Sequence, residues 1–560
     1  MRGSFGTRKF KALLLAGSFT VLANYIVRLS DSVIAGSLLG ADALAGVNLA
    51  GPFLSTISFL SGLISTGMAT NYSLAMGRCD RERARQFAMQ GFWSVLIFGG
   101  MLALAGLFGR GLFLGFFGAS PEVTAYAAGY LAWVWPMAVI EGLEMLLVAL
   151  GYADGDAKVC SLGYAVIFIG NFVISVIGVK LGLGTAGCAI GSVVSGVLGV
   201  AVLSTHFLRR GNTFAPVRHF SIRDSWRIVA ASFGDAAAFL CDGLLFLFLN
   251  KFVIVHYGSG FLPVVGVATS LWGFLEFFNG VGVAIQPIVT VYYGEGNMKS
   301  VRTVMNSAMR VAVVEGVAFM AFFGLFPELV VSLVGIEDAE LARQSVTAIR
   351  CMCGGFVALA FAGLFNSYYM FVERPVLAGA VTVLCYLAMP VACVAFCSIP
   401  LGVVGVWLGV GLGPFAAIIV LAAIMIPIAG WRAFPLLLPR GRDAKTHVFN
   451  LRLTDREIVA TSRQVAGLEG VPMRAGLMVE EVFMAVKDRA GGRTLLGEVT
   501  IDLNDGVQMT LRDDGEIFDI TDADQQISSL RTFLVASMMY AQGDRLNLVT
   551  TGFNRNVFRF

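Results

Sequence analysis

Long apolar stretches separated by short polar connections dominate the first 440 residues of the chain. A helix needs roughly 20 mainly apolar residues to cross a bilayer. Twelve stretches of this kind predict transmembrane helices at about residues 12–37, 43–75, 88–113, 122–150, 158–180, 184–208, 226–256, 261–293, 306–333, 346–372, 376–400 and 402–430. After residue 445 short apolar runs alternate with polar residues, as they do in a soluble domain.

The distribution of charge supports the same division. Residues 1–440 hold 46 charged side chains, about one in ten, whereas residues 441–560 hold 14 basic and 17 acidic ones, about one in four. About one charged residue in four is usual for a soluble domain, whereas about one in ten is not. The composition therefore excludes an ordinary soluble enzyme. A net charge of +3 is too small to indicate a nucleic-acid-binding protein.

Basic residues also predict the orientation of the helices. They cluster within residues 2–11, 78–85, 209–227, 299–302 and 432–442. Each cluster precedes the first predicted helix or follows an even-numbered one. Because basic connections stay on the cytoplasmic side, we expect a multi-pass protein of the cytoplasmic (inner) membrane with both termini in the cytoplasm.

An internal repeat divides the membrane part into two halves. The sequence AGV (45–47), followed by a long apolar run that ends in AMGRCDRERA (75–84), has a counterpart in VGV (265–267) and YYGEGNMKSV (292–301). The offset is 217 to 220 residues. Such repeats are typical of secondary transporters, and they predict two six-helix lobes at residues 1–220 and 221–435. The nine cysteines form no CxxC pair and histidines number four, so no zinc site and no disulfide framework are expected.

Four segments resemble multidrug and toxic compound extrusion (MATE) transporters. These are DSVIAGSLLGADALAGVNLAGPF (31–53), GNFVISVIGVKLGLGTAGCAIGSVVSG (170–196), QPIVTVYYGEGN (286–297) and LFNSYYMFVERP (364–375). The resemblance implies an antiporter that exports organic compounds by alternating access, coupled to H⁺ or Na⁺. Asp31 matches the acid of the family's first helix. Asn171 matches the Asn of the fifth helix, and Ser175 stands where one branch of the family has an acid.

Acidic residues inside predicted membrane helices are functional candidates, because a charge there is costly. The candidates for ion coupling or substrate contact are Asp31, the pair Glu141 and Glu144, and Asp242. Carboxyl groups in a poorly hydrated site hold protons more tightly, which suits a proton carrier. Alternatively, Asp31 with Asn171, Ser175 and Ser192 offers oxygen ligands to Na⁺. A purely structural pairing of these acids is the third interpretation.

The tail, residues 446–560, alternates predicted strands and helices, including a helix at 473–489 and a last helix after residue 520. It is expected to be a small α/β sandwich with helices on one mixed sheet. It resembles the GHKL-type ATPase domain of histidine kinases and anti-sigma factors. The resemblance identifies Glu481, Asp513 and Gly515 as a nucleotide-binding remnant. Ala485 stands where that family has a Mg²⁺-binding Asn, and residues 525–539 replace its glycine-rich lid. ATP hydrolysis is therefore not expected.

The sequence favours a secondary exporter of small organic compounds, such as lipophilic cations, with no resident cofactor. The tail would be a regulatory module, with a cytoplasmic protein as a possible partner. Two alternatives stay open. One is a membrane sensor that signals through the tail, and the other is a lipid-precursor flippase.

Overall fold

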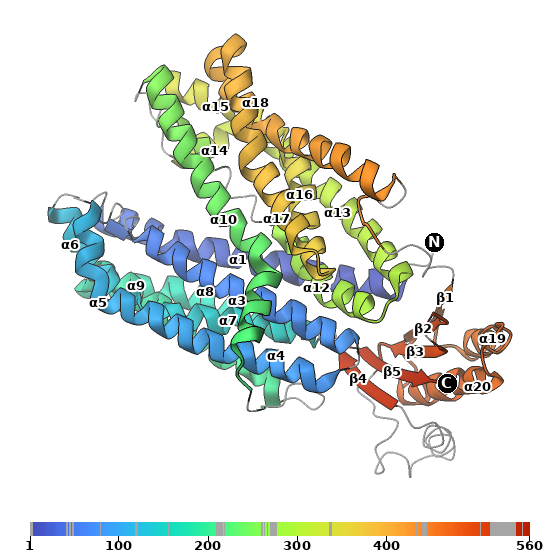
Figure 1. Cartoon of the computed structure of the whole chain (residues 1–560). Coiled ribbons are helices and arrows are strands. Elements are labelled where there is room, and N and C mark those ends of the chain that lie inside the picture. The colour runs from blue at the N-terminus through green and yellow to red at the C-terminus, as the bar shows by residue number, and fades with distance from the viewer. Residues whose placement is uncertain are drawn as a thin grey trace.

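The structure is a computed structural model with two groups of helices and a small α/β tail (Figure 1). It describes residues 4–560 apart from the segments 41–42, 44–45, 48–49, 79, 118–120, 155, 209–216, 218, 259–260, 262–263, 266, 269–270, 272–276, 335–338, 432–433, 439–444, 505, 516–544 and 551–552.

The first helical group occupies the N-terminal part of the chain. Its helices are α1 (Phe5–Leu39), α3 (Gly51–Gly77), α4 (Arg81–Ser94), α5 (Gly100–Phe117), α6 (Pro121–Val134), α7 (Met137–Ala153), α8 (Ala157–Gly178) and α9 (Thr185–Ser204). A π-helical turn at Val95–Gly99 joins α4 to α5, another at Val179–Leu183 follows α8, and a 3₁₀ turn at Thr205–Leu208 follows α9.

The second helical group follows from residue 222. Its helices are α10 (Ile222–Tyr257), α12 (Asn279–Gly294), α13 (Met298–Leu325), α14 (Pro327–Val334), α15 (Ala339–Cys353), α16 (Phe356–Phe371), α17 (Pro375–Val383) and α18 (Met389–Ala429). A π-helical turn at Leu384–Ala388 joins α17 to α18.

Several of these helices suit a bilayer by length and composition. Among the described residues, five helical spans meet that requirement alone, and two bent pairs, α6 with α7 and α15 with α16, meet it together. The longest span, Pro375–Ile428, is interrupted at Gly402, whose φ of 57° is not helical. This break confirms the boundary that the sequence predicts between helices at 376–400 and 402–430.

The two groups meet at the end that lies near the tail, and in Figure 1 they spread apart away from it. Helix α3 of the first group packs against α10 and α12 of the second. A Cβ atom on Gly77, at the end of α3, would lie 2.9 Å from the Cα atom of Gly294, at the end of α12. The ends of these two helices therefore lie so close together that only glycine, which has no Cβ atom, fits at these two positions.

Residues where the two helical groups meet recur with the 217-residue offset of the internal sequence repeat. Gly77 and Gly294 are 217 residues apart, as are the next helices' N-caps, Asp80 of α4 and Asn297 of α13. Each cap side chain accepts a hydrogen bond from the backbone N–H three residues on, which satisfies an otherwise unpaired donor.

The tail forms a five-stranded sheet in the order β1-β2-β3-β5-β4. Its strands are β1 (Thr446–Arg452), β2 (Leu496–Asp502), β3 (Gln508–Asp513), β4 (Arg545–Thr550) and β5 (Phe553–Arg559). Every one of these pairings is antiparallel, so the expectation of a mixed sheet is wrong. The predicted helix after residue 520 falls outside the described residues.

Two helices, α19 (Asp455–Ala466) and α20 (Met473–Arg489), cover one face of the sheet. Thr454 caps α19 by accepting a hydrogen bond from the N–H of Glu457. Val499, Ile501, Met509 and Leu511 of β2 and β3 are buried against these helices. The opposite face of the sheet faces the helical groups.

Candidate functional site

A buried polar cluster surrounds Asp31 in the first helical group. Tyr130 Oη and Ser192 Oγ donate hydrogen bonds to Asp31 Oδ2 over 2.7 and 2.8 Å, and Asn171 Nδ2 lies 3.3 Å from Oδ1. Asn171 also donates to Ser192 Oγ and accepts from Ser30 Oγ. Asp31 is 5% exposed and Asn171 is fully buried, so the cluster lies in the interior of the group.

Close packing of α8 on α9 brings the members of the cluster together. A Cβ atom on Gly187 of α9 would lie 2.6 Å from the carbonyl carbon of Gly178 on α8, and one on Gly191 would lie 2.1 Å from Ser175 Oγ. Small residues let membrane helices approach in this way. Asn171 of α8 and Ser192 of α9 then meet Asp31 of α1.

Ser175 lies beside this cluster and does not contact Asp31 by any of the hydrogen bonds described. Its Oγ donates to the carbonyl of Cys188 over 3.3 Å. The structure thus brings together three of the four residues grouped by the sequence, and adds Tyr130 of α6, which the sequence analysis missed. A Tyr hydroxyl in a mainly apolar helix is a sequence feature of this kind, but Tyr126 on the same helix offers it equally, so the sequence does not single out Tyr130.

Glu141 and Glu144 of α7 form a second acidic position in the same group. Ser58 Oγ of α3 donates to Glu141 Oε1 over 2.6 Å. Glu144 is 5% exposed, and its Oε1 has no hydrogen-bond partner among the described residues. Asp242 belongs to α10, but its side chain lies outside the described part of the structure.

An apolar pocket lies in the second group, away from both acidic positions. Helices α13, α16, α17 and α18 contribute to its lining, which includes Met309, Phe361, Phe365, Leu421 and Met425. The pocket and the Asp31 cluster therefore belong to different helical groups.

The proposed nucleotide remnant in the tail is tightly packed around Asp513. Asn554 Nδ2 and the N–H of Gly515 donate to Asp513 Oδ1 over 2.8 and 3.0 Å. Burial raises the pKa of Asp513 to about 7. A Cβ atom on Gly515 would lie 2.9 Å from Val486, so α20 fills the adjacent space. Glu481 is half-buried on α20, and Ala485 is 5% exposed.

A row of polar side chains crosses the other face of the tail sheet. The antiparallel register places Asn450, Glu498, Arg512 and Arg555 side by side on β1, β2, β3 and β5. Paired residues in a sheet point to the same face. We call these four residues the docking row.

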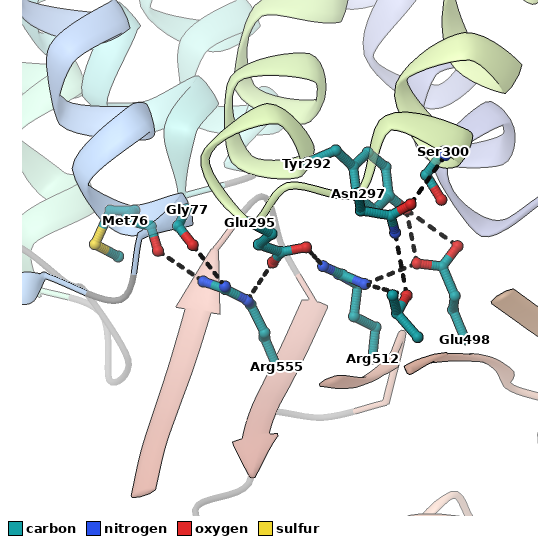
Figure 2. A network of polar contacts seen from close by, with 10 residues as sticks. Met76, Gly77, Tyr292, Glu295, Asn297, Ser300, Glu498, Arg512 and Arg555 are labelled. Carbon is teal, nitrogen blue, oxygen red and sulfur yellow. Dashed lines mark hydrogen bonds and ion pairs between the residues drawn. The ribbon is translucent and has the colours of Figure 1, made fainter. Parts of the chain in front are cut away.

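Each residue of the docking row contacts a helical group, as Figure 2 shows for three of them. Asn450 Oδ1 accepts from the N–H of Phe5 at the start of α1, over 2.7 Å. Glu498 accepts from Tyr292 Oη of α12 over 3.0 Å, and Arg512 pairs with Glu295, the C-cap of α12.

Arg555 makes the contact with both groups. Its Nη1 and Nη2 atoms donate to the carbonyls of Met76 and Gly77 at the end of α3, over 2.7 and 3.0 Å (Figure 2). Its Nε atom lies 2.6 Å from Glu295 Oε1 at the end of α12.

Each charged side chain at this interface has an oppositely charged partner and is excluded from water. The side chains of Arg512, Arg555, Glu295 and Glu498 are 0–2% exposed. Arg512 Nη1 also donates to Glu498 Oε1 over 2.8 Å. Burial raises the pKa of Glu498, and Arg512 opposes that shift. The interface cannot be recognised in the sequence, because alternating polar residues on a strand also fit a solvent-exposed face.

A family model described as MatE matches residues 17–178 and 237–408, more than half of the chain and one segment in each helical group. The match ends before the tail. The chain is 26% identical over 451 residues to a probable multidrug resistance protein NorM of Rhizobium meliloti, covering 74% of this chain and 90% of that protein. It is 26% identical over 458 residues to the protein of the same name in Pseudomonas putida, covering 74% and 94%.

Solved structures share the fold of the helical groups. A structure described as the outward-facing conformation of a multidrug resistance MATE family transporter of the MOP superfamily aligns with a TM-score of 0.69 and 23% identity, over 76% of this chain and 97% of that one. A MATE structure described as the straight conformation aligns equally well, at 22% identity over the same shares. About a quarter of this chain has no counterpart in either structure.

Proposed function

The chain belongs to the MatE family, and we propose that it is a secondary active exporter of small organic compounds, driven by an ion that binds at Asp31. As a member of this family it is a multi-pass membrane transporter and not an enzyme. The coupling ion, the alternating-access mechanism and the regulatory role of the tail are parts of the proposal.

The proposed architecture has twelve transmembrane helices in two six-helix lobes, residues 1–220 and 221–435. The two matched segments of the family model, one in each half, support this repeat. The basic clusters at residues 78–85 and 432–442 support a cytoplasmic position for both termini and for the tail, in the inner membrane. Alternating access would then open the space between the lobes to one side of the membrane at a time.

The single observation that carries the coupling proposal is the Asp31 cluster. One buried carboxylate has only neutral partners, Tyr130, Asn171 and Ser192. A proton can bind such a carboxylate without leaving another charge unpaired. Asn171 directs its amide nitrogen to Asp31 and its oxygen to Ser30, an arrangement that favours a proton over Na⁺, which takes oxygen ligands.

Glu141, Glu144 and Asp242 are proposed as further ion or substrate contacts. Glu144 has a buried oxygen without a hydrogen-bond partner among the described residues, so it offers an acceptor to a proton or a cationic group. Asp242 stays a prediction of a second proton carrier in the second lobe. Lipophilic cations suit the apolar pocket lined by Met and Phe side chains, since aromatic faces attract cations.

The test is transport by the full chain in proteoliposomes. Uptake of a lipophilic cation such as tetraphenylphosphonium is measured with an imposed pH gradient and, separately, with a Na⁺ gradient. Asp31→Asn is expected to abolish gradient-driven uptake, whereas Glu122→Gln, at an exposed acid on α6, is the matched control. Undiminished uptake in Asp31→Asn would remove Asp31 from the mechanism.

The docked tail also fits the second candidate, a membrane sensor that signals through its tail. The contact of Arg555 with both helical groups would transmit a change in their relative position. Binding of a lipophilic compound without gradient-driven uptake would favour this alternative over the exporter. No described contact favours a flippase.

A further inference from the structure

We propose that the tail sheet is a latch, which holds the two helical groups together at their tail-proximal ends through Arg555. The latch deepens the proposed function, because it assigns the regulatory role of the tail to the step in which the groups separate. The proposal concerns an interaction within the chain, so it can be tested without substrate.

The latch acts where the two groups are closest. The ends of α3 and α12 meet at Gly77 and Gly294, and a Cβ atom on Gly77 would lie 2.6 Å from the carbonyl oxygen of Val291. Any opening of the transporter on the side of the tail has to separate these two helix ends. A group that binds both of them therefore opposes that opening directly.

Arg555 is such a group. The last carbonyls of a helix have no partner within the helix and carry its negative dipole, and Arg555 binds two of them at the end of α3, Met76 and Gly77. The same guanidinium pairs with Glu295 at the end of α12. Its five N–H donors in a planar fork allow one side chain to bind both helix ends.

Other polar contacts join the two groups, among them the ion pair of Arg83 on α4 with Asp224 on α10, but none of those described binds the ends of both α3 and α12. Arg78 and Glu373 form an ion pair of 2.6 Å, but their side chains are about half exposed, and exposed pairs contribute little. Gln286 lies 3.3 Å from Thr70 Oγ1. Arg555, which is fully buried, is thus the strongest charged connection between the two helix ends among the described residues.

Arg512 has a separate role, because it attaches the tail to the second group alone. It pairs with Glu295 and Glu498 and makes no described contact with the first group. If the first group moves away while the tail stays on the second, Arg555 loses both α3 carbonyls. Loss of Arg555 leaves Glu295 paired with Arg512, so the tail should remain docked while the latch is open.

The experiment measures the distance between the two groups in the full chain. Spin labels are attached to ketone-bearing amino acids at two exposed positions, Glu82 of the first group and Lys299 of the second, so that the native cysteines remain. Distances are recorded in nanodiscs without substrate. Arg555→Ala is compared with Arg559→Ala, which removes an exposed arginine from the same strand.

We expect one short distance in the parent and in Arg559→Ala, and a second, longer one in Arg555→Ala. Breaking a buried charge contact should raise the ratio of separated to closed molecules by at least about tenfold. Should Arg555→Ala fail to fold, Arg555→Lys serves the same purpose, because one ammonium cannot span the three acceptors. An unchanged distance distribution in a folded Arg555 variant overturns the latch.

The outcome is independent of transport. A chain that fails to take up any cation but shows the longer distance in Arg555→Ala retains the latch and loses the proposed coupling. A chain that transports but keeps one distance in every variant retains the coupling and loses the latch.

Discussion

The Asp31 cluster and the docking interface bury charge in opposite ways. Asp31 is a single acid whose partners are a phenol, an amide and a hydroxyl, all within one helical group. The interface holds two acids and two arginines from the tail and α12, so its charges cancel.

The difference indicates what each arrangement is suited to do. A proton added to Asp31 neutralises a lone buried charge, so its occupancy can change during a transport cycle. A proton added to Glu295 would leave the buried guanidinium of Arg555 without its described counter-charge, which is costly. The first cluster is suited to exchange an ion, and the second to hold two parts of the chain together.

The largest expected effect is at the docking interface, where each charged side chain has an oppositely charged partner. Arg512→Ala removes the partner of two buried acids, Glu295 and Glu498, and should cost about 3–5 kcal/mol of docking free energy. We expect faster hydrogen exchange in β2, in β3 and in the first turn of α1 of the full chain. Arg559→Ala is the control, and equal exchange in both variants would show that the network does not hold the tail.

The next effect concerns the Asp31 cluster, where the described hydrogen-bond partners of the carboxylate carry no charge. Ser192→Ala removes a hydrogen bond to the Asp31 carboxylate, worth about 1.5–3 kcal/mol. It should shift the ion concentration for half-maximal cation uptake by about tenfold or more. Ser175→Ala, one turn from Asn171 on α8, removes only a bond to the Cys188 carbonyl and should leave that concentration within about twofold. Equal shifts would mean that Ser175 belongs to the site.

The third effect concerns Asp513, an acid of the tail whose hydrogen-bond partners are neutral, as those of Asp31 are. Its pKa is raised to about 7 by burial, so the folded tail binds a proton that the unfolded tail releases near pH 4. The stabilisation is complete below about pH 4 and is lost as pH rises through 7, by at most about 4 kcal/mol.

Asp513→Asn should make this loss disappear, because Asn cannot ionise and its oxygen can still accept from Asn554 and Gly515. The measurement is hydrogen exchange of β3 and β5 in the full chain between pH 5 and 8, corrected for intrinsic rates. A pH dependence as steep in the variant as in the parent would assign it to another group.

Much of the fold follows from local sequence features. The predicted boundary between the helices at 376–400 and 402–430 coincides with the non-helical backbone at Gly402. The predicted helix at 473–489 matches α20, because its apolar positions recur at helical spacing. Strand direction in the tail was not predictable in this way. Whether β3 pairs with β5 depends on residues that are more than 40 positions apart.

The site was predictable only in part for the same reason. Asp31, Asn171 and Ser192 stand out as polar residues in apolar helices, and the structure brings them together. Tyr130 joins them from a helix whose sequence does not single it out. The docking row was missed because Glu498, Arg512 and Arg555 alternate with apolar or neutral residues, as in any strand with one wet face.

The separation in sequence of the docking partners has a consequence for biogenesis. Arg555 and Met76 are 479 residues apart, Asn450 and Phe5 are 445 apart, and Tyr292 and Glu498 are 206 apart. Contacts this distant form late, after the intervening segments have folded, and domains generally fold in order from the N-terminus during synthesis. The tail can therefore dock only after both helical groups have been inserted and joined, so docking marks a correctly assembled molecule.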